Sequence, residues 1–538
     1  MLDWITAIVF LFIVGALATW ILLKSFRAQL RQPPSNYEKL VAISNIEDAP
    51  LPAKIRKPQV RRQLILGTRN PSLLNNLTEM SAAHLAIDVP IKKPLIYGFF
   101  HPNANAFGGG ERVLWAAIKE IVASDQHAVA AIYISAEKGL NPEEVLVKVN
   151  ERFGIGYTQK ESDRIVFIAL SQTSLVSPLT YPILTLLGQA IGQALLGYEA
   201  ISNLMPDVFV DTSGLAFSFP IVSWFAKIPI VAYVHYPFVQ AAMVNSLHAR
   251  ISKPKSVIKY IYYKCLTIAY KWAGSYADVV SVNSSWTSKY LNWPQPNRII
   301  YPPCAVQEFT EPVLGERTPA LVYLAQFRPE KRHDLVITEF AKVKAKAKKS
   351  NKIPKSHLIL LGSVRNDIDA AYVLNLHALA KACGLTDNDY TIVENAPWEN
   401  IKRILVTSSI GLNAMWNEHF GMGVVEIMAA GLIPVVNASG GPYMDIVKDD
   451  EGAPGFFFKS ETDPDFSADE KFNSLADAMI EALSLNIDEQ NELRKRCYKA
   501  SQRFSDPVFF GEWRKEIDAA KKKQVKCAEL RKKLNLFD

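Results

Sequence analysis

Charged residues are scarce in this sequence. Aspartate, glutamate, lysine and arginine make up 21% of the 538 residues, whereas hydrophobic residues make up 49%. Such a composition calls for a membrane segment or for large parallel sheets, whose strands are buried on both faces. The net charge of +7 is small for this length, so the balance of charges gives no strong indication of binding to free nucleic acid.

Cysteine is also rare. The chain has five cysteines, an odd number, and none of them lie in pairs at the spacing of metal ligands. The sequence therefore offers neither a zinc motif nor a disulfide framework, and it favours a reducing compartment. The cysteines are Cys265, Cys304, Cys383, Cys497 and Cys527.

Near the start of the chain, residues 4–23 form a run without any charge. The run is long enough to cross about 30 Å of hydrocarbon. Lys24, Arg27 and Arg31 follow it, and the positive-inside rule then places the rest of the chain in the cytosol. A cleaved signal peptide is the alternative, but Asp3 stands where positive charge is expected and no small-x-small cleavage site follows. We therefore predict a transmembrane anchor over residues 1–31.

Residues 32–92 combine mixed charge with weak periodicity and the pair Pro33-Pro34, so we expect a linker there. Basic residues gather in this segment and again around residues 253–272, where they alternate with tyrosine and tryptophan. Cations beside amphipathic aromatics suit a surface near anionic lipid; an ordinary solvated helix is the alternative. The basic residues are Lys54, Arg56, Lys57, Arg61 and Arg62, and then Lys253, Lys255, Lys259, Lys264 and Lys271.

From residue 93 onward, short apolar runs alternate with helical stretches. This is the βαβ pattern of a parallel sheet, and it starts again after Tyr301-Pro302-Pro303. We predict an α/β protein with two doubly wound, Rossmann-like domains in tandem, facing a cleft, at 93–305 and 306–505. A helical extension covers 506–538. The predicted strands are 95–100, 128–134, 165–168, 208–210, 230–234 and 279–282, and then 320–324, 358–361, 390–393, 410–413 and 433–436.

Residues 174–201 fit this pattern badly, because they are almost free of charge. A second membrane crossing here would split one domain across the bilayer, so we do not predict one. Two alternatives remain open: a core helix of the first domain, or a helix that dips into the cytosolic leaflet.

The most informative stretch is 417–436, NEHFGMGVVEIMAAGLIPVV. It reads as a glycine-rich loop, a short helix, a glycine stop and a buried strand. Gly421 and Gly423 let backbone amides approach a ligand where the helix begins, and a helix N-terminus suits a phosphate. Glu418 and Glu426 flank this anion site, where a carboxylate would bind ribose or sugar hydroxyls rather than phosphate. The alternative is an ordinary loop-helix-strand unit, with Glu426 on a solvated face.

Two further glycine turns follow predicted strands. Gly108, Gly109 and Gly110 lead from the first strand into a helix, and the amides of this turn suit a second anion. Gly440 and Gly441 end strand 433–436 and would let the chain turn beside the ligand.

Charged and titratable residues follow two other strands. His235 comes directly after strand 230–234, where a lone histidine is more often structural than catalytic. Arg328 and Lys331 follow strand 320–324, and two cations at this place match the charge of a pyrophosphate.

Together these motifs resemble the retaining GT-B glycosyltransferases. Among these, they are most similar to the GDP-mannose-dependent α-1,2-mannosyltransferases of the dolichol-linked oligosaccharide pathway of asparagine-linked glycosylation. The resemblance covers residues 93–510 and the N-terminal anchor. The motifs that carry it are GGGERVLW at 108–115, VHYP at 234–237, FRPEK at 327–331, NEHFG at 417–421 and GGP at 440–442.

The resemblance implies an activity and a location. Such enzymes transfer the fourth and fifth mannoses, both α-1,2-linked, from GDP-mannose to a dolichyl-pyrophosphate-linked oligosaccharide. They act on the cytosolic face of the endoplasmic reticulum membrane, where other mannosyltransferases of the pathway are candidate partners. The domain at 93–305 would face the acceptor and the membrane, and the domain at 306–505 would bind the nucleotide sugar. No bound metal or other cofactor is expected.

The resemblance also implies roles for single residues. Glu418 would contact the transferred sugar and Glu426 the ribose. Lys331 and Arg328 would neutralise the diphosphate, and His235 would orient the sugar or the acceptor. The backbone amides expected to help bind the diphosphate belong to Phe420, Gly421, Met422, Gly423 and Val424.

The sequence departs from the family pattern at one position. Many relatives have an arginine five positions before the lysine, but here Gln326 stands there and Arg328 lies only three positions before Lys331. Two alternative functions stay open. One is a membrane-bound GT-B enzyme with another donor or lipid acceptor, and the other is a catalytically silent scaffold of a glycosyltransferase complex.

Overall fold

The computed structural model describes residues 23–30, 94–136, 142–239, 254–350, 353–467, 469, 471–534 and 536. The predicted linker and all but the last residue of the predicted membrane run lie outside these residues, as do Lys253 and the basic residues at 54–62. In the part of the chain that is described, no helix is long and apolar enough to cross a membrane.

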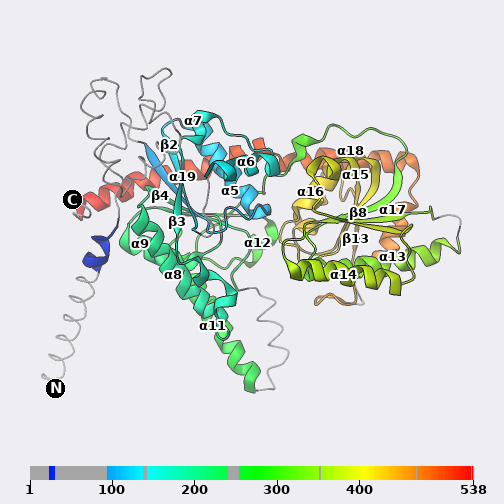
Figure 1. Ribbon diagram of the computed structural model, residues 1–538, viewed down its shortest axis with the longest axis horizontal. Coiled ribbons are helices and arrows are strands. Elements are labelled where there is room, and N and C mark those ends of the chain that lie inside the picture. The colour runs from blue at the N-terminus through cyan, green and yellow to red at the C-terminus, as the bar shows by residue number, and fades with distance from the viewer. Residues whose placement is uncertain are drawn as a thin grey trace. The chain divides into compact units, whose positions relative to one another are not determined.

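The chain forms two compact units (Figure 1). Unit 1 holds the chain up to Val282, together with Tyr290–Arg298 and Phe510–Asp538, and unit 2 holds Asn283–Lys289 and Ile299–Phe509. The helices of unit 1 are α5 Gly109–Ser124, α6 Pro142–Phe153, α7 Gln159–Ser162, α8 Thr185–Asn203, α9 Phe219–Phe225 and α11 Pro254–Gly274. All of α12 Ser285–Tyr290 except its last residue belongs to unit 2. Those of unit 2 are α13 His333–Ala347, α14 Asp367–Ala382, α15 Trp398–Thr407, α16 Met422–Ala429, α17 Leu475–Leu483 and α18 Ile487–Ser501, and α19 Asp506–Lys533 follows.

Unit 1 is built on a seven-stranded sheet with the order β3-β2-β1-β4-β5-β6-β7. The pairings from β3 through to β6 are parallel. Short runs of apolar and β-branched residues form these strands, which suits a sheet covered on both faces. The strands are β1 Leu95–Phe100, β2 Ala128–Ser135, β3 Ile165–Leu170, β4 Val208–Asp211, β5 Ile230–Val234, β6 Val279–Val282 and β7 Arg298–Ile299.

Unit 2 repeats this plan with a six-stranded sheet of order β10-β9-β8-β11-β12-β13, parallel throughout. Every strand predicted from the sequence is present in one of the two sheets. The short edge strands β7 and β13 were not predicted, because two or three residues carry no readable periodicity. The strands are β8 Thr318–Leu324, β9 His357–Gly362, β10 Tyr390–Glu394, β11 Ser408–Asn413, β12 Ile433–Asn437 and β13 Phe456–Phe458.

The strand order reverses once in each sheet, between β1 and β4 in unit 1 and between β8 and β11 in unit 2. In a doubly wound sheet, the two connections at such a point leave in opposite directions, and they open a crevice at the carboxyl ends of the two strands. The residues that follow β1, β4, β8 and β11 are therefore the first place to look for a site.

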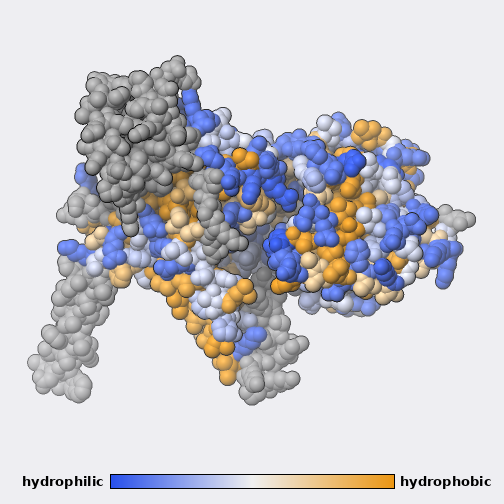
Figure 2. All heavy atoms as spheres, in the orientation of Figure 1, coloured by the Kyte–Doolittle hydropathy of each residue, from blue (hydrophilic) through white to orange (hydrophobic). Residues whose placement is uncertain are grey.

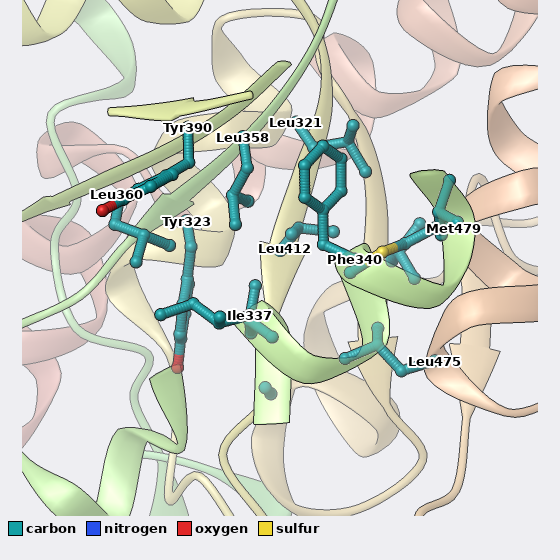
Figure 3. Close-up of a cluster of buried hydrophobic side chains, with 14 of the residues drawn as sticks. Leu321, Tyr323, Ile337, Phe340, Leu358, Leu360, Tyr390, Leu412, Leu475 and Met479 are labelled. Carbon is teal, nitrogen blue, oxygen red and sulfur yellow. The ribbon is translucent and has the colours of Figure 1, made fainter. Parts of the chain in front are cut away.

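The core of unit 2 has two layers of side chains, one on each face of its sheet. Figure 3 shows part of the first layer, where Leu321 of β8 and Leu412 of β11 lie toward Phe340 of α13. Leu475 and Met479 of α17 complete this side. The second layer packs under α16 and α18. Because each large apolar side chain contributes roughly 1.5–3 kcal/mol when buried, these layers hold the strand ends in place.

Residues 174–201 form two 3-10 turns, η1 Thr173–Val176 and η2 Pro178–Thr180, followed by most of α8. One side of α8 is buried through Leu196, Ala200 and Ile201, whereas Ile191 and Leu195 are exposed. The segment is thus a core helix on one side only, and its other side is apolar and uncovered.

The C-terminal helix α19 was expected as an extension, but from Phe510 onward it belongs to unit 1. Trp513 is fully buried, with its ring 6.3 Å from that of Tyr233 in β5. Arg514 contacts Glu120 of α5 at 2.6 Å. The basic composition of the helix hides this role, because only a few of its apolar residues in unit 1 are buried, among them Trp513, Ile517 and Ala520.

Replacing Trp513 tests this packing. We expect Trp513→Ala to lower the free energy of unfolding of unit 1 by about 3–5 kcal/mol, measured as the denaturant midpoint of the unit 1 transition. Val525→Ala is the matched control, since Val525 lies in the same helix and is 56% exposed. Equal effects of the two substitutions would mean that the helix does not belong to the unit 1 core.

Candidate functional site

The residues after β1 and β4 are joined at the point where the strand order of unit 1 reverses. His101 directly follows β1, and its Nδ1 lies 2.8 Å from Oγ1 of Thr212, which follows β4. His101 is buried, and its Nε2 lies 3.2 Å from Oε1 of Glu111 in α5. A single chain of hydrogen bonds therefore connects two strand ends to the first turn of a helix.

Glu111 also binds the start of its own helix. The amide of Gly108 donates to Oε2 of Glu111 at 2.6 Å. Burial tends to raise the pKa of Glu111, but the hydrogen bond from His101 and the backbone amides outweigh it and keep this pKa below its ordinary value. The amide of Gly108, which was predicted to meet an anion, is thus already bound to the carboxylate of Glu111. The amides of Gly109 and Gly110 remain at this helix start.

His235 belongs to the same network. Its Nε2 donates to the carbonyl of Thr212 at 3.1 Å, and because a carbonyl only accepts, this bond fixes the proton on Nε2. A Cβ on Gly110 would lie 3.5 Å from this nitrogen, so the imidazole lies against the first turn of α5. The structure therefore brings His235 and Gly110 together, with Thr212 holding the ring.

Asp211, the last residue of β4, shapes the turn that carries Thr212. Its carboxylate accepts hydrogen bonds from the amides of Ser213, Gly214 and Leu215. Burial raises the pKa of Asp211 to about 7, against the opposing effect of these three amides. The turn is therefore fixed by a fully buried carboxyl group.

In unit 2, Lys331 and Glu418 form an ion pair across the point where the strand order reverses. Lys331 ends a 3-10 turn after β8, and Glu418 lies in the loop between β11 and α16. Both side chains are mostly buried, at 19% and 13% exposure. Burial tends to raise the pKa of Glu418, but the charge and hydrogen bond of Lys331 outweigh it, and the pKa lies below its ordinary value. The two residues predicted to act on the sugar and the diphosphate are thus in contact.

The glycines around Glu418 are required by backbone contacts. A Cβ on Gly440, whose φ is +64°, would lie 2.1 Å from the carbonyl oxygen of Glu418, and the amide of Gly441 donates to that oxygen at 2.7 Å. Gly421 has a φ of +107°, and a Cβ on Gly423 would lie 2.7 Å from the carbonyl oxygen of Leu324. Four glycines therefore let three backbone segments pack closely enough to place Glu418.

A chain of hydrogen-bonded polar side chains supports the same loop. Asn417 has a φ of +52°, and its amide donates a hydrogen bond to the hydroxyl of Ser439. That hydroxyl in turn donates to Oδ1 of Asn437. Asn437 donates to Asp463 at 2.8 Å, and Asp463 forms an ion pair with Arg332. Because Arg332 directly follows Lys331, this chain joins both partners of the ion pair.

Three more residues border Glu418. The ring of His419 stacks on Trp286 at 4.7 Å, and the pKa of His419 is lowered by burial and by the charge of Lys331, against the effect of Glu418. Asn413, at the end of β11, makes a side-chain hydrogen bond to Glu418. Its Oδ1 is buried and has no hydrogen-bond partner in the described part of the chain. One buried acceptor beside the carboxylate therefore has no donor among the described residues.

The other predicted residues of unit 2 are less close to the ion pair. Arg328 is a third exposed and contacts Glu330 at 3.5 Å. Phe420 is a core residue, with its ring 5.9 Å from that of Tyr301. Glu426 is half-buried within α16.

The start of α16 retains two amides that suit an anion. The amide of Val424 already donates to the carbonyl of Gly421 at 2.9 Å, which leaves those of Met422 and Gly423 in the first turn. No group of three or more potential metal-ligating side chains is found among the described residues.

Sequence reasoning missed the residues that hold the site together. His101, Thr212 and Asn413 are polar residues at the carboxyl ends of strands, and this position alone was a usable signal. Arg332, Asp463 and Trp286 had none, because their contacts come from segments far apart in sequence.

The Lys331–Glu418 pair gives a stability prediction. The low folded-state pKa of Glu418 means that the pair stabilises unit 2 above the ordinary glutamate pKa of 4.5, and that this stabilisation is lost as pH falls through the lowered value. Lys331→Met leaves a buried carboxylate unpaired, so we expect a loss of about 3 kcal/mol at pH 7.

The double variant Lys331→Met/Glu418→Gln provides the control. It should recover most of that loss in urea unfolding at pH 7, and the Lys331→Met deficit should shrink below pH 4.5. If the double variant lost the sum of the stabilities that the two single variants lose, with no recovery, the two side chains would not be coupled in solution.

Comparison with solved structures places the fold. A sucrose-phosphate synthase from Thermosynechococcus elongatus matches with a TM-score of 0.56 and 15% identity, over 79% of this chain and 100% of that one. Anabaena HepE matches with a TM-score of 0.53 and 14% identity, over 79% and 99%. At this identity the likeness concerns the fold alone, and it confirms two Rossmann-like domains of the GT-B type.

Sequence comparison places the family. Residues 94–293 match the family described as ALG11 mannosyltransferase N-terminus, and residues 307–504 match glycosyl transferases group 1. Relatives named GDP-Man:Man(3)GlcNAc(2)-PP-Dol alpha-1,2-mannosyltransferase include one from Yarrowia lipolytica, 35% identical over 93% of this chain and 89% of its own. The relative from Homo sapiens is 37% identical over 78% and 85%. The chain therefore belongs to the family of GDP-Man:Man(3)GlcNAc(2)-PP-Dol alpha-1,2-mannosyltransferases, which are glycosyltransferase enzymes.

Proposed function

We propose that this protein transfers mannose from GDP-mannose, with retention at the anomeric carbon, to a dolichyl-pyrophosphate-linked oligosaccharide. The transfers add the fourth and fifth mannoses through α-1,2 links. Membership of the mannosyltransferase family carries this proposal. The Lys331–Glu418 pair, at the strand-order reversal of a nucleotide-binding type of sheet, supports it independently.

The donor would bind to unit 2. Lys331 supplies a cation next to the remaining amides of the α16 N-terminus, and a diphosphate there would share that cation with Glu418. Arg328 adds a second, more exposed positive charge. Glu426, about one turn into α16, would accept hydrogen bonds from the ribose hydroxyls. The arrangement neutralises a leaving diphosphate without any metal, and we expect none.

The transferred mannose would lie against Glu418 and Asn413. The carboxylate is kept ionised by Lys331, so it accepts hydrogen bonds from sugar hydroxyls and favours positive charge that develops at the anomeric carbon. The buried Oδ1 of Asn413 accepts one more hydroxyl. A sugar at this position would satisfy an acceptor that otherwise has no partner among the described residues.

Retention is explained by transfer on the front face of the sugar. The bond between the anomeric carbon and the diphosphate oxygen breaks, and the acceptor hydroxyl oxygen bonds to that carbon from the same side. The hydroxyl proton passes to the departing diphosphate, whose charge Lys331 and Arg328 stabilise. In unit 1, His235 would orient the sugar or the acceptor, because its ring is held by Thr212.

We place the reaction on the cytosolic face of the endoplasmic reticulum membrane. The uncharged run at residues 4–23 and the positive charges after it support this location. Other mannosyltransferases of the same pathway are the expected protein partners, since each product is the next acceptor.

Product analysis tests the function directly. Purified protein incubated with GDP-mannose and a lipid-linked acceptor that carries three mannoses should yield a product with five. Linkage analysis should find both added mannoses α-1,2-linked. Consumption of UDP-sugars, with GDP-mannose left intact, would replace the donor assignment by another GT-B activity.

Glu418→Gln separates chemistry from folding. The amide oxygen still accepts from Lys331 and the shape is kept, so the variant should fold. The uncompensated charge of Lys331 lowers its melting temperature, and we expect kcat of the folded protein to fall about 100-fold. Glu399→Gln, at a side chain of α15 that is 81% exposed and pairs with Lys402, should retain full activity. If Glu418→Gln also retained wild-type kcat, Glu418 would have no electrostatic role in the transfer.

A further inference from the structure

Two helices of unit 1 expose apolar stripes. On α11, Ile258, Ile261, Ile268 and Trp272 are exposed, and their spacing of three, seven and four residues places them on one side of the helix. Leu266, on the other side, is buried. Exposed apolar residues that occur singly are ordinary, but a continuous stripe marks an interaction surface.

The second stripe lies on α8 and the turn before it. Leu184, Leu187, Ile191 and Leu195 follow one another at intervals of three or four residues and are all exposed. Ahead of them lie two of the most exposed apolar side chains of unit 1, Leu179 of η2 at 93% and Ile183, between η2 and α8, at 78%.

The two stripes form one surface. The hydroxyl of Tyr262 in α11 accepts a hydrogen bond from the amide of Leu187 in α8 at 3.0 Å. Figure 2 shows hydrophobic side chains gathered where Figure 1 places α8 and α11. We refer to the exposed apolar residues of η2, α8 and α11 as the apolar face.

The charges of this surface have one sign. The α11 sequence contains lysines and no aspartate or glutamate. The one acidic residue of α8, Glu199, lies near its end, where it accepts hydrogen bonds from Ser171 and Gln172. Lys259 lies over the ring of Tyr263 and Lys264 over that of Tyr260. Lysine and tyrosine beside an apolar stripe are the pattern of a helix lying in the headgroup region of anionic lipid.

A third observation links this surface to the start of the chain. The residues that follow the uncharged run at 4–23 pack on unit 1, where the ring of Phe26 lies 5.3 Å from that of Tyr198 in α8. Arg27 donates to the carbonyl of Trp224 at 2.8 Å. The end of the predicted anchor is therefore attached to the helix that carries part of the apolar face.

We propose that the apolar face is a membrane-docking surface, which inserts into the headgroup region of a bilayer containing anionic lipid and holds unit 1 against it. The proposal deepens the proposed function, because a lipid-linked acceptor has to be taken from that bilayer. It also answers the alternatives left open by the sequence: α8 would contribute to the protein core on one side and to the leaflet on the other.

Site-specific quenching tests the proposal without relying on the anchor. Cys265 lies exposed on α11, within the stripe that includes Ile261 and Ile268. With Cys383→Ser and Cys527→Ser, a fluorophore on Cys265 of the full chain reports this position in nanodiscs that contain phosphatidylserine. Doxyl-labelled lipid should quench it strongly.

The chain offers a matched control probe. With Cys265→Ser and Cys527→Ser, the same fluorophore on Cys383 reports α14 of unit 2. We expect quenching at Cys265 to exceed that at Cys383 several-fold. Equal quenching at the two positions would overturn the proposal. A second outcome would also overturn it: a fluorophore on Cys265 that is shielded from solvent in the absence of lipid, in a protein particle of twice the mass of one chain. In that case a second copy of the chain would cover the apolar face.

A kinetic test uses the transfer reaction. Ile258→Glu/Ile268→Glu should raise KM for a long-chain lipid-linked acceptor at least about tenfold, because losing the burial of even one of the two side chains would have this effect. Turnover of a short-chain, water-soluble acceptor should not change. Ile368→Glu/Leu374→Glu, on the exposed side of α14, should change neither.

The two measurements separate the proposals. Quenching at Cys265 does not require turnover, so it would persist if the proposed reaction were wrong. The docking surface would be rejected, and the proposed function kept, by one combination of results. Transfer would be normal, KM would not differ between the two double variants, and quenching would be equal at both probes.

Discussion

The candidate site in unit 2 depends on one requirement: a buried carboxylate must stay ionised. Glu418 meets it through Lys331, whose charge outweighs the cost of burial. Lys331 and Glu418 lie 87 positions apart in the sequence, so the pair forms only when the fold brings them together. The doubly wound sheet brings β8 and β11 side by side, and the turns that follow these strands then lie within reach of each other.

The glycines have a clear physical role in this arrangement. Gly440 and Gly441 let one turn contact the carbonyl groups of the Glu418 loop directly, and Gly423 lets the start of α16 approach the end of β8. The motif was predicted to bring backbone amides close to a ligand. The distances indicate that its glycines first bring backbone close to backbone, and that two helix amides remain for a ligand as a result. The glycines at these positions thus allow the backbone contacts that hold the Glu418 side chain in place.

The sequence predicted the strands and the two Rossmann-like domains well, because buried parallel strands give short apolar runs with clear limits. The separate roles of Glu418 and Lys331 came from family resemblance, and their contact was not predicted. The sequence did not predict the bonds among His101, Thr212 and His235, or the chain from Ser439 to Arg332, because hydrogen bonds between distant segments leave no local pattern. The role of α19 was missed for a related reason: a helix rich in lysine can still bury one tryptophan.

The scarcity of charge has more than one physical cause in this chain. Two buried parallel sheets account for much of the apolar content, since both faces of each sheet are covered. The uncharged run near the start accounts for another part. Neither explains why α8 and α11 expose isoleucine and leucine at helical spacing while the only charged residues of α11 are lysines. A lipid surface explains this, because it accepts apolar side chains and attracts cations at the same depth. The same surface would bring the acceptor to an enzyme whose donor arrives from water.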